Sequence, residues 1–195
     1  LAKPAKPHDP DTLCLVASVD GRHDDATEVF LASLRAVADD QPSVQVFFDV
    51  RHRETHTLWR AIDRLGLAPH CTITRQRQGQ REALLNADAL VLPQPLGQAQ
   101  PLTLRAMAHA LPVIAIDDPA LDYLLHERTA RVLHRPSAAE WANALNDLAR
   151  HPDRARKLGQ SAREWVGQHH LAVTQVDKLL HLYRSITGET LPFAV

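Results

Sequence analysis

The sequence predicts an α/β domain built on a doubly wound parallel sheet. Short apolar runs alternate with longer amphipathic segments through most of the chain. A strand buried inside a parallel sheet is apolar on both faces, whereas a helix that covers the sheet is apolar along one side. The alternation of these two patterns is typical of a parallel sheet with helices on both faces. With 45% hydrophobic residues in 195, the chain can supply the core of one such domain.

The predicted strands are short and rich in aliphatic residues. They cover residues 13–17, 44–50, 71–74, 89–92, 113–116 and 131–134. The predicted helices have apolar residues three and four positions apart, which is the spacing of one helix face. They cover residues 27–38, 54–65, 80–86, 100–110, 137–150, 152–168 and 173–186. This order predicts a Rossmann-like layer structure followed by extra C-terminal helices.

Local signals support several of these elements. Pro101 favours the first turn of the helix 100–110, because proline lacks the N–H that a first turn leaves unpaired. Ser137 and Glu140 have the spacing of a capping box, which predicts a helix start at Ser137. The tryptophans fall at amphipathic spacing. We therefore expect core or helix-packing positions for Trp59, Trp141 and Trp165.

Composition limits the domain organisation and the partners. Residues 1–11 hold three prolines and no apolar periodicity, which predicts a linker, and residues 12–195 read as a single domain. A net charge of −1 argues against a nucleic-acid partner, since such proteins concentrate basic charge. No apolar run reaches the ~18 residues of a membrane-spanning helix, so we expect no transmembrane segment.

The two cysteines indicate a reducing compartment. Cys14 and Cys71 each lie in a short apolar run, and two cysteines form neither a disulfide framework nor a zinc site. Both therefore read as buried strand thiols. We expect a cytoplasmic protein, because reduced thiols persist there.

Residues 87–115 carry the clearest motif of the chain, and they read ADALVLPQPLGQAQPLTLRAMAHALPVIA. This block resembles group-1 glycosyltransferases of the GT-B fold. In that family AD-x-x-V-L-P precedes a glycine-rich turn, a Glu-bearing helix and A-M-A-x-G-x-P-V-I-A. Two later segments are similar to that family in the same order. They are residues 121–133, similar to P-E-I-x-x-x-G-x-T-G-L-L-V, and residues 152–163, similar to P-x-x-R-x-x-L-G-x-x-A-R.

The resemblance, from about residue 13 to about 166, implies the C-terminal half of a GT-B protein, which binds the nucleotide of a donor sugar. Its ligand would lie outside the carboxyl ends of the strands. Family enzymes neutralise the donor diphosphate with an Arg and a Lys five residues apart after the first strand. Those positions correspond to Asp20 and Asp25, or Arg22 takes the arginine role if the loop is two residues longer. The family's glutamate for the donor sugar corresponds to Gly97, and its glutamate for the ribose corresponds to Arg105.

The turn between those two positions also departs from the family. The family's E-G-F-G becomes Gly97, Gln98, Ala99 and Gln100. The glycine of A-x-G-x-P becomes Ala110, and Glu127 replaces another loop glycine. Phosphate-binding loops use glycine to bring the backbone close to the ligand, so these replacements work against a phosphate site.

Energetics predict a degenerate donor site. Two charge-assisted hydrogen bonds of ~1.5–3 kcal/mol each are missing, and this weakens nucleotide binding by roughly a hundred- to ten-thousand-fold. We therefore expect no catalytic residue, no cofactor and no turnover by the isolated domain. Three functions stay open. They are a structural or regulatory part of a glycosyltransferase-like protein, an active transferase in which Arg105 and Arg22 hold phosphate, and a protein-binding or assembly module.

The terminal helices suggest a partner surface. In the family the last helix crosses back to the N-terminal domain, so residues 173–186 and the apolar end 191–195 could contact a second GT-B domain or another protein. Packing against their own domain is the alternative.

Other polar patterns have simple structural interpretations. His52 and His56 lack a third metal ligand, so we expect surface histidines and no metal. The acidic run at Asp24 could bind a cation, or it could cap the helix at Thr27. His109 could act as a general base or cover a helix end.

Overall fold

The computed structural model describes residues 12–21, 24–51, 55–74, 77–97, 101–170 and 172–187. Its strands are β1 (Cys14–Val19), β2 (Gln45–Val50), β3 (Cys71–Thr74), β4 (Ala89–Leu92), β5 (Val113–Ile116) and β6 (Arg131–Leu133). Within these residues they form one parallel sheet of six strands in the order β3-β2-β1-β4-β5-β6. This is the order of a doubly wound Rossmann-like sheet, and the winding changes direction between β1 and β4. The predicted fold class is confirmed.

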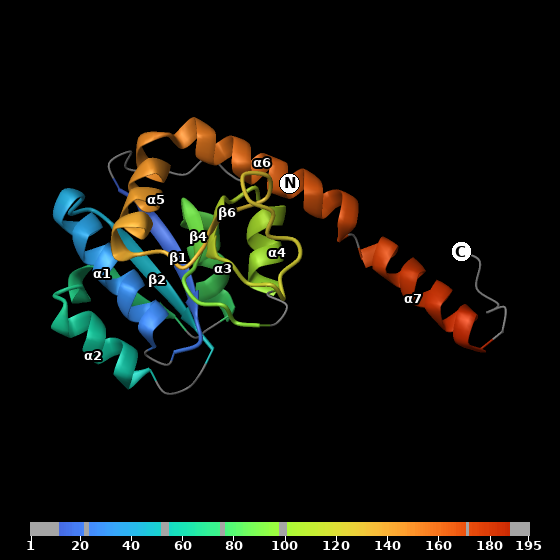
Figure 1. Ribbon diagram of the computed structural model, residues 1–195, viewed down its shortest axis with the longest axis horizontal. Coiled ribbons are helices and arrows are strands. Elements are labelled where there is room, and N and C mark those ends of the chain that lie inside the picture. The colour runs from blue at the N-terminus through green and yellow to red at the C-terminus, as the bar shows by residue number, and fades with distance from the viewer. Residues whose placement is uncertain are drawn as a thin grey trace.

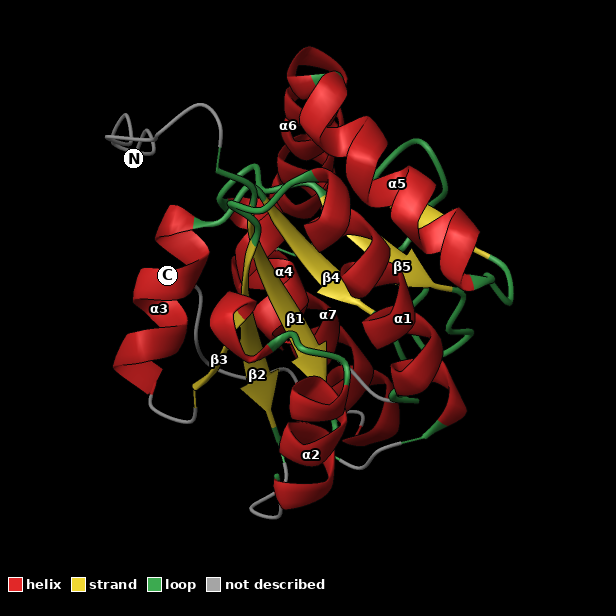
Figure 2. Ribbon diagram, turned by 90° about the vertical axis from the view of Figure 1, so that its left-hand side faces the viewer, coloured by secondary structure: helices red, strands yellow, loops and turns green. Residues whose placement is uncertain are grey.

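The helices form two layers that enclose the sheet (Figures 1 and 2). They are α1 (Asp25–Asp40), α2 (His56–Arg64), α3 (Arg77–Asn86), α4 (Pro101–Ala108), α5 (Ala138–Arg150), α6 (Pro152–His169) and α7 (Ala172–Thr187), with a short 3-10 turn η1 at Ala68–His70. Helices α1, α2 and α5 cover one face, and α3, α4 and α6 cover the other. Helix α7 extends away from these layers (Figure 1).

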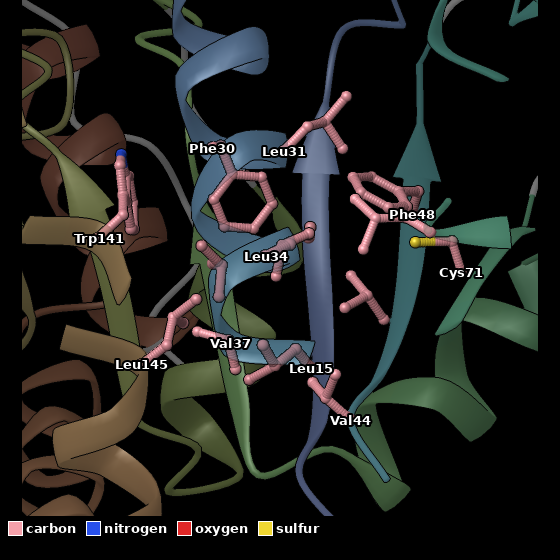
Figure 3. Packing of buried hydrophobic residues seen from close by; sticks show 14 of the residues in the cluster. Leu15, Phe30, Leu31, Leu34, Val37, Val44, Phe48, Cys71, Trp141 and Leu145 are labelled. Atoms are coloured by element: carbon pink, nitrogen blue, oxygen red, sulfur yellow. The ribbon is translucent and has the colours of Figure 1, made fainter. Parts of the chain in front are cut away.

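Aromatic packing anchors the first layer to the sheet. The Phe30 ring meets Trp141 of α5 edge-on at a centroid distance of 5.3 Å, and it meets Phe48 of β2 at 6.4 Å. Figure 3 shows these side chains between α1, α5 and the strands. Trp141 is 1% exposed, which confirms its predicted core position. Edge-to-face pairs of this kind add about 0.5–1.5 kcal/mol to the free energy of burial.

Trp59 contradicts the predicted packing. The side of α2 that faces the core carries Leu58, Ala61 and Ile62, which are three and four residues apart. Trp59 follows Leu58 by one position, about 100° around the helix, and it is 41% exposed. The expectation of a core tryptophan at this position is wrong.

Two positions at which the family motif has glycine adopt a backbone that favours glycine. Ala110 closes α4 with φ 56°, and Glu127 lies in the loop before β6 with φ 56°. Side chains rarely occupy this left-handed region, which costs about 1–2 kcal/mol for a residue with a Cβ. At both positions the chain therefore has a residue with a Cβ on a strained, left-handed backbone.

Gly159 lets α6 pack directly on the turn after α4. A Cβ at Gly159 would overlap the carbonyl oxygen of Ala110 and would lie 2.8 Å from its carbonyl carbon. This contact joins two of the helices that cover the second face of the sheet.

The remaining boundaries differ from the predictions at helix ends. Helix α1 begins at Asp25 because Asp24, not Thr27, is its N-cap. Helix α3 begins earlier than residue 80, and α4 ends at Ala108. The predicted linker, residues 1–11, lies outside the described residues. No described helix is long and apolar enough to span a membrane.

Candidate functional site at the carboxyl edge

The expected site residues lie where β1, β4 and β5 end. We call residues 20–21, 24–25, 93–97 and 117–120 the carboxyl edge, because they follow the carboxyl ends of these strands. Strands β1 and β4 are neighbours in the sheet, and the strand order runs in opposite directions on their two sides. Ligands of such sheets usually bind at this change of direction. The fold thus brings the segment of Asp20 and Asp25 beside that of Gly97.

Gln94 bridges the two segments. Its side-chain oxygen accepts a hydrogen bond of 2.7 Å from the Asp20 backbone N–H, and its amide Nε2 donates one of 2.6 Å to the Asp24 carboxylate. Gln94 is 5% exposed, whereas its partner Asp24 is an exposed residue, so the bridge runs from a buried amide to the surface. The bridge joins the loop after β1 to the loop after β4 at the change of winding.

The Asp24 carboxylate is held from a second direction by α1. Its Oδ1 accepts from the Thr27 backbone N–H at 2.8 Å and from the Thr27 hydroxyl at 2.6 Å. This is an N-cap, in which a side chain satisfies an unpaired N–H of the first turn. The capping interpretation of the acidic run is confirmed for Asp24, and Asp25 is the exposed first residue of α1.

Asp118 organises the loop at Gly97. The Asp118 carboxylate accepts from the Gly97 backbone N–H at 2.9 Å and from the Ala120 backbone N–H at 3.0 Å. Asp118 is 6% exposed, and Gly97 adopts φ 63°. Gly97, which corresponds to the family's first glutamate, is therefore bound through its backbone N–H to the loop after β5.

Arg105 lies in the last turn of α4 and is exposed. A cation there is favoured by the carboxyl end of the helix dipole, whereas an anion is attracted to the opposite end. This placement matches the interpretation of Arg105 as a solvated helix residue. Arg22, Gln98 and Ala99 lie outside the described residues.

A third buried polar group lies between β1, β2 and α3. Asp49 is 6% exposed, and its carboxylate accepts from the Gln80 amide and, at 3.4 Å, from the Ser18 hydroxyl. Burial raises the pKa of Asp49, against the opposing effects of Gln80, Ser18 and Arg51. The carboxylate is thus more costly to ionise here than in water.

Comparison with known proteins assigns the family. Residues 10–151 match the family model described as glycosyl transferases group 1. The chain belongs to this family. No curated protein sequence matches the chain.

Solved structures show the same fold at low sequence identity. Sucrose-phosphate synthase from Thermosynechococcus elongatus has a TM-score of 0.74 at 21% identity, over 93% of this chain and 47% of its own. A glycosyltransferase from Rickettsia africae has 0.79 at 14% identity, over 94% and 50%. Anabaena HepE in complex with UDP has 0.75 at 16% identity, over 89% and 49%. The chain therefore spans about half the length of each of these proteins.

A small pocket of this group 1 glycosyltransferase domain lies at the opposite edge of the sheet. It opens between α5 and α6 near the amino ends of β5 and β6. Arg131 donates to Asp147 at 2.6 Å, and His151 lies 2.8 Å from the same carboxylate. Partial burial acts to raise the pKa of Asp147, but Arg131, His151 and Arg154 together lower it. These ion pairs join β6, α5 and α6 far from the carboxyl edge.

Other predicted groups have plain structural roles in this glycosyltransferase domain. His109 lies in the turn between α4 and β5, at the edge opposite the carboxyl ends of the strands. The hypothesis that His109 is a general base at the expected site is therefore wrong. Cys14 and Cys71 are buried thiols, and burial raises the pKa of Cys71 to about 12. Among the described residues, no group of three His, Cys, Asp or Glu side chains could hold a metal ion. His52 lies outside these residues.

Sequence reasoning missed Gln94 and Asp118. Both follow a fully apolar strand by two positions, which is a usable signal, because polar residues just after a parallel strand lie at the ligand edge. Their partners lie 70 and 21 residues away in the chain, so the bonds themselves could not be predicted from local pattern.

Proposed function

We propose that this domain is a structural or regulatory part of a glycosyltransferase-like protein and that its donor site does not hold a nucleotide sugar. The observation that carries the proposal is the bridge from Gln94 to Asp20 and Asp24. Polar groups at the ligand edge of an α/β sheet normally face a ligand. Here the buried Gln94 side chain bonds to the Asp20 backbone and to the exposed Asp24 carboxylate, so a diphosphate would have to displace these bonds.

Charge supports the same conclusion. Asp20 and Asp25 correspond to the family's diphosphate-binding Arg and Lys, and Asp24 and Asp118 add two carboxylates to the carboxyl edge. Like charges repel, and a diphosphate brings at least two negative charges. Arg105 lies in the last turn of α4, away from the amino end at which a helix attracts anions.

Nucleotide binding is tested by thermal unfolding with millimolar UDP, GDP, ADP and their sugar conjugates. A ligand at about one hundred times its Kd adds ~2.7 kcal/mol, which raises the midpoint by roughly 5–10 °C at this size. We expect no shift in the wild type. If one nucleotide raised the midpoint and Arg105→Ala abolished that shift, the domain would have a rebuilt phosphate site. The active-transferase function would then be favoured, and our proposal would be wrong.

We further propose that α7 packs on a companion domain. Its exposed apolar residues are spaced along one side, and they are Val176, Leu179, Leu182, Tyr183 and Ile186. Five large apolar side chains more than half exposed on one helix are unusual for a surface that faces water. The neighbouring structures are about twice as long as this chain, so such proteins have room for a second domain.

Hydrogen exchange tests this packing. We expect the backbone of α7 to exchange rapidly in the 195-residue chain and slowly in a longer protein that carries the companion domain. Leu179→Ser with Leu182→Ser should remove the difference, whereas His181→Ser with Arg184→Ser, also exposed on α7, should preserve it. Equal, rapid exchange in both proteins would contradict the proposal. If a stable complex forms with an unrelated protein instead, the assembly-module function is favoured.

The cysteines support a cytoplasmic location for the same protein. Both cysteines are buried thiols that form no disulfide within the described residues, which suits a reducing compartment.

A further inference from the structure

Among the described residues β6 is one of the two terminal strands of the sheet, and the loop before it makes a single bridge to its outer side, between His126 and Ala130. The outward N–H of Val132 is capped by a histidine side chain. Leu133 of β6 faces β5, because its carbonyl oxygen accepts from the Asp117 backbone N–H at 2.9 Å. Alternate residues of a parallel strand bond to opposite neighbours, so Val132 faces away from β5. The Val132 backbone N–H donates to His126 Nδ1 at 3.1 Å. An imidazole thus occupies the place of a neighbouring strand.

The direction of this hydrogen bond determines which ring nitrogen of His126 carries a hydrogen. A backbone N–H can only donate, so Nδ1 must accept through its lone pair and carry no hydrogen. The ring is therefore neutral, with its single hydrogen on Nε2, which lies 4.0 Å from Glu127 Oε1. A second proton would have to bind at Nδ1, the atom that caps the strand.

The surroundings of His126 leave its ring open to protonation by water. The His126 side chain is 56% exposed, so water reaches the ring. Glu127, the nearest carboxylate, is also bound by Arg154 of α6 at 2.9 Å. Arg131, on β6 itself, is bound by Asp147 of α5. Arg154 and Arg131 are thus each paired with a carboxylate, and the Glu127 carboxylate lies close enough to attract a protonated His126 ring.

We propose that His126 is an acid-sensitive cap on the free edge of the sheet. Binding of a proton to Nδ1 converts the acceptor into a donor, which then opposes the Val132 N–H. The bond breaks, the protonated ring is drawn toward Glu127, and the edge of β6 presents an unpaired N–H. Uptake of this proton therefore opens the edge, and its loss closes the edge again. An unpaired strand edge is a site for association with other extended chains.

Amide hydrogen exchange of Val132, followed by NMR in the 195-residue protein, tests this device. After correction for the intrinsic pH dependence, we expect the protection of Val132 to fall roughly threefold to tenfold between about pH 8 and about pH 5, the effect of losing one hydrogen bond. The amide of Ala115, inside the sheet on β5, should keep its protection.

Two variants separate the proton from the contact. His126→Asn places an amide oxygen near the position of Nδ1, so Val132 should stay protected at both pH values. His126→Ala should leave Val132 poorly protected at both. Protection of Val132 that does not change with pH in the wild type would overturn the proposal. An equal loss in His126→Asn, or a parallel loss at Ala115, would also overturn it.

Discussion

The Gln94 amide donates a hydrogen bond of 2.6 Å to the Asp24 carboxylate, across the boundary between β1 and β4. Asp24 also caps α1, so one carboxylate ties a helix start to a loop 70 residues further along the chain. At this boundary an α/β sheet normally offers its open donors to a ligand. In this family member the donors of Gln94 and Thr27 are used by an internal anion. The fold is that of the family, and these polar groups bond to one another across the two loops.

Gln94→Ala should destabilise the domain by about 1–3 kcal/mol, because it leaves the Asp20 N–H without its side-chain acceptor and removes one donor from Asp24. Urea unfolding followed by circular dichroism measures the change. Gln160→Ala is the matched control, since Gln160 is exposed on α6 and donates to Glu164 of the same helix at 3.1 Å. Equal, small effects of the two substitutions would show that the bridge contributes nothing.

Two buried threonines should respond oppositely to loss of the hydroxyl. The Thr103 hydroxyl is buried on α4 and has no hydrogen-bond partner among the described residues, so Thr103→Val should be neutral or should stabilise by about 1 kcal/mol. The Thr27 hydroxyl donates to Asp24 at 2.6 Å, so Thr27→Val should destabilise by about 1 kcal/mol. Thermal and urea midpoints of both variants check the sign. A destabilised Thr103→Val would mean that its hydroxyl has a bonding role.

Element types could be predicted because the strands are apolar on both faces and the helices on one. β4, with all four residues buried, is a clear case. Helix ends were harder, since both Asp24 and Thr27 are good caps and only the bond to Thr27 N decides between them. Trp59 shows the same limit, because a shift of one residue moves a side chain from the core side of α2 to water.

The candidate site divides along similar lines. The family motif located the carboxyl edge, and the left-handed backbone of Ala110 and Glu127 follows the motif's glycines. What the motif could not predict is how the replacements are satisfied. Gln94 and Asp118 bond to residues in other loops, and such pairing depends on the folded positions of three strands.

Gly159→Ala should be among the most damaging single substitutions, with a loss of roughly 3 kcal/mol or more. The added methyl group would overlap the Ala110 carbonyl, and backbone on both sides would have to move apart. Gly167→Ala, on the same helix, meets nothing within 4 Å and should stabilise by up to about 1 kcal/mol. Comparison of the two unfolding midpoints separates the contact from helix propensity. If Gly159→Ala matched Gly167→Ala, α6 would not pack on the turn after α4.

Asp49→Asn should stabilise the domain at neutral pH. Burial raises the pKa of Asp49, so the folded state holds the proton more tightly than the unfolded chain. Stability therefore falls as pH rises from the ordinary aspartate value of about 3.9 through the raised value, and the cost remains above it. An asparagine can still accept from Gln80 but never ionises.

Urea unfolding of both proteins between about pH 3 and about pH 7 measures this effect. The advantage of the asparagine variant should be smallest at the acid end, grow through the titration of Asp49 and then stay constant. Asp63→Asn, at an exposed position on α2, should show no such growth. A variant that is less stable than the wild type at neutral pH would mean that the bonds from Gln80 and Ser18 outweigh desolvation. The Asp49 carboxylate of β2 would then stabilise the fold as an anion. It would be held by Gln80 and Ser18 in the way that Asp24 is held by Thr27 and Gln94.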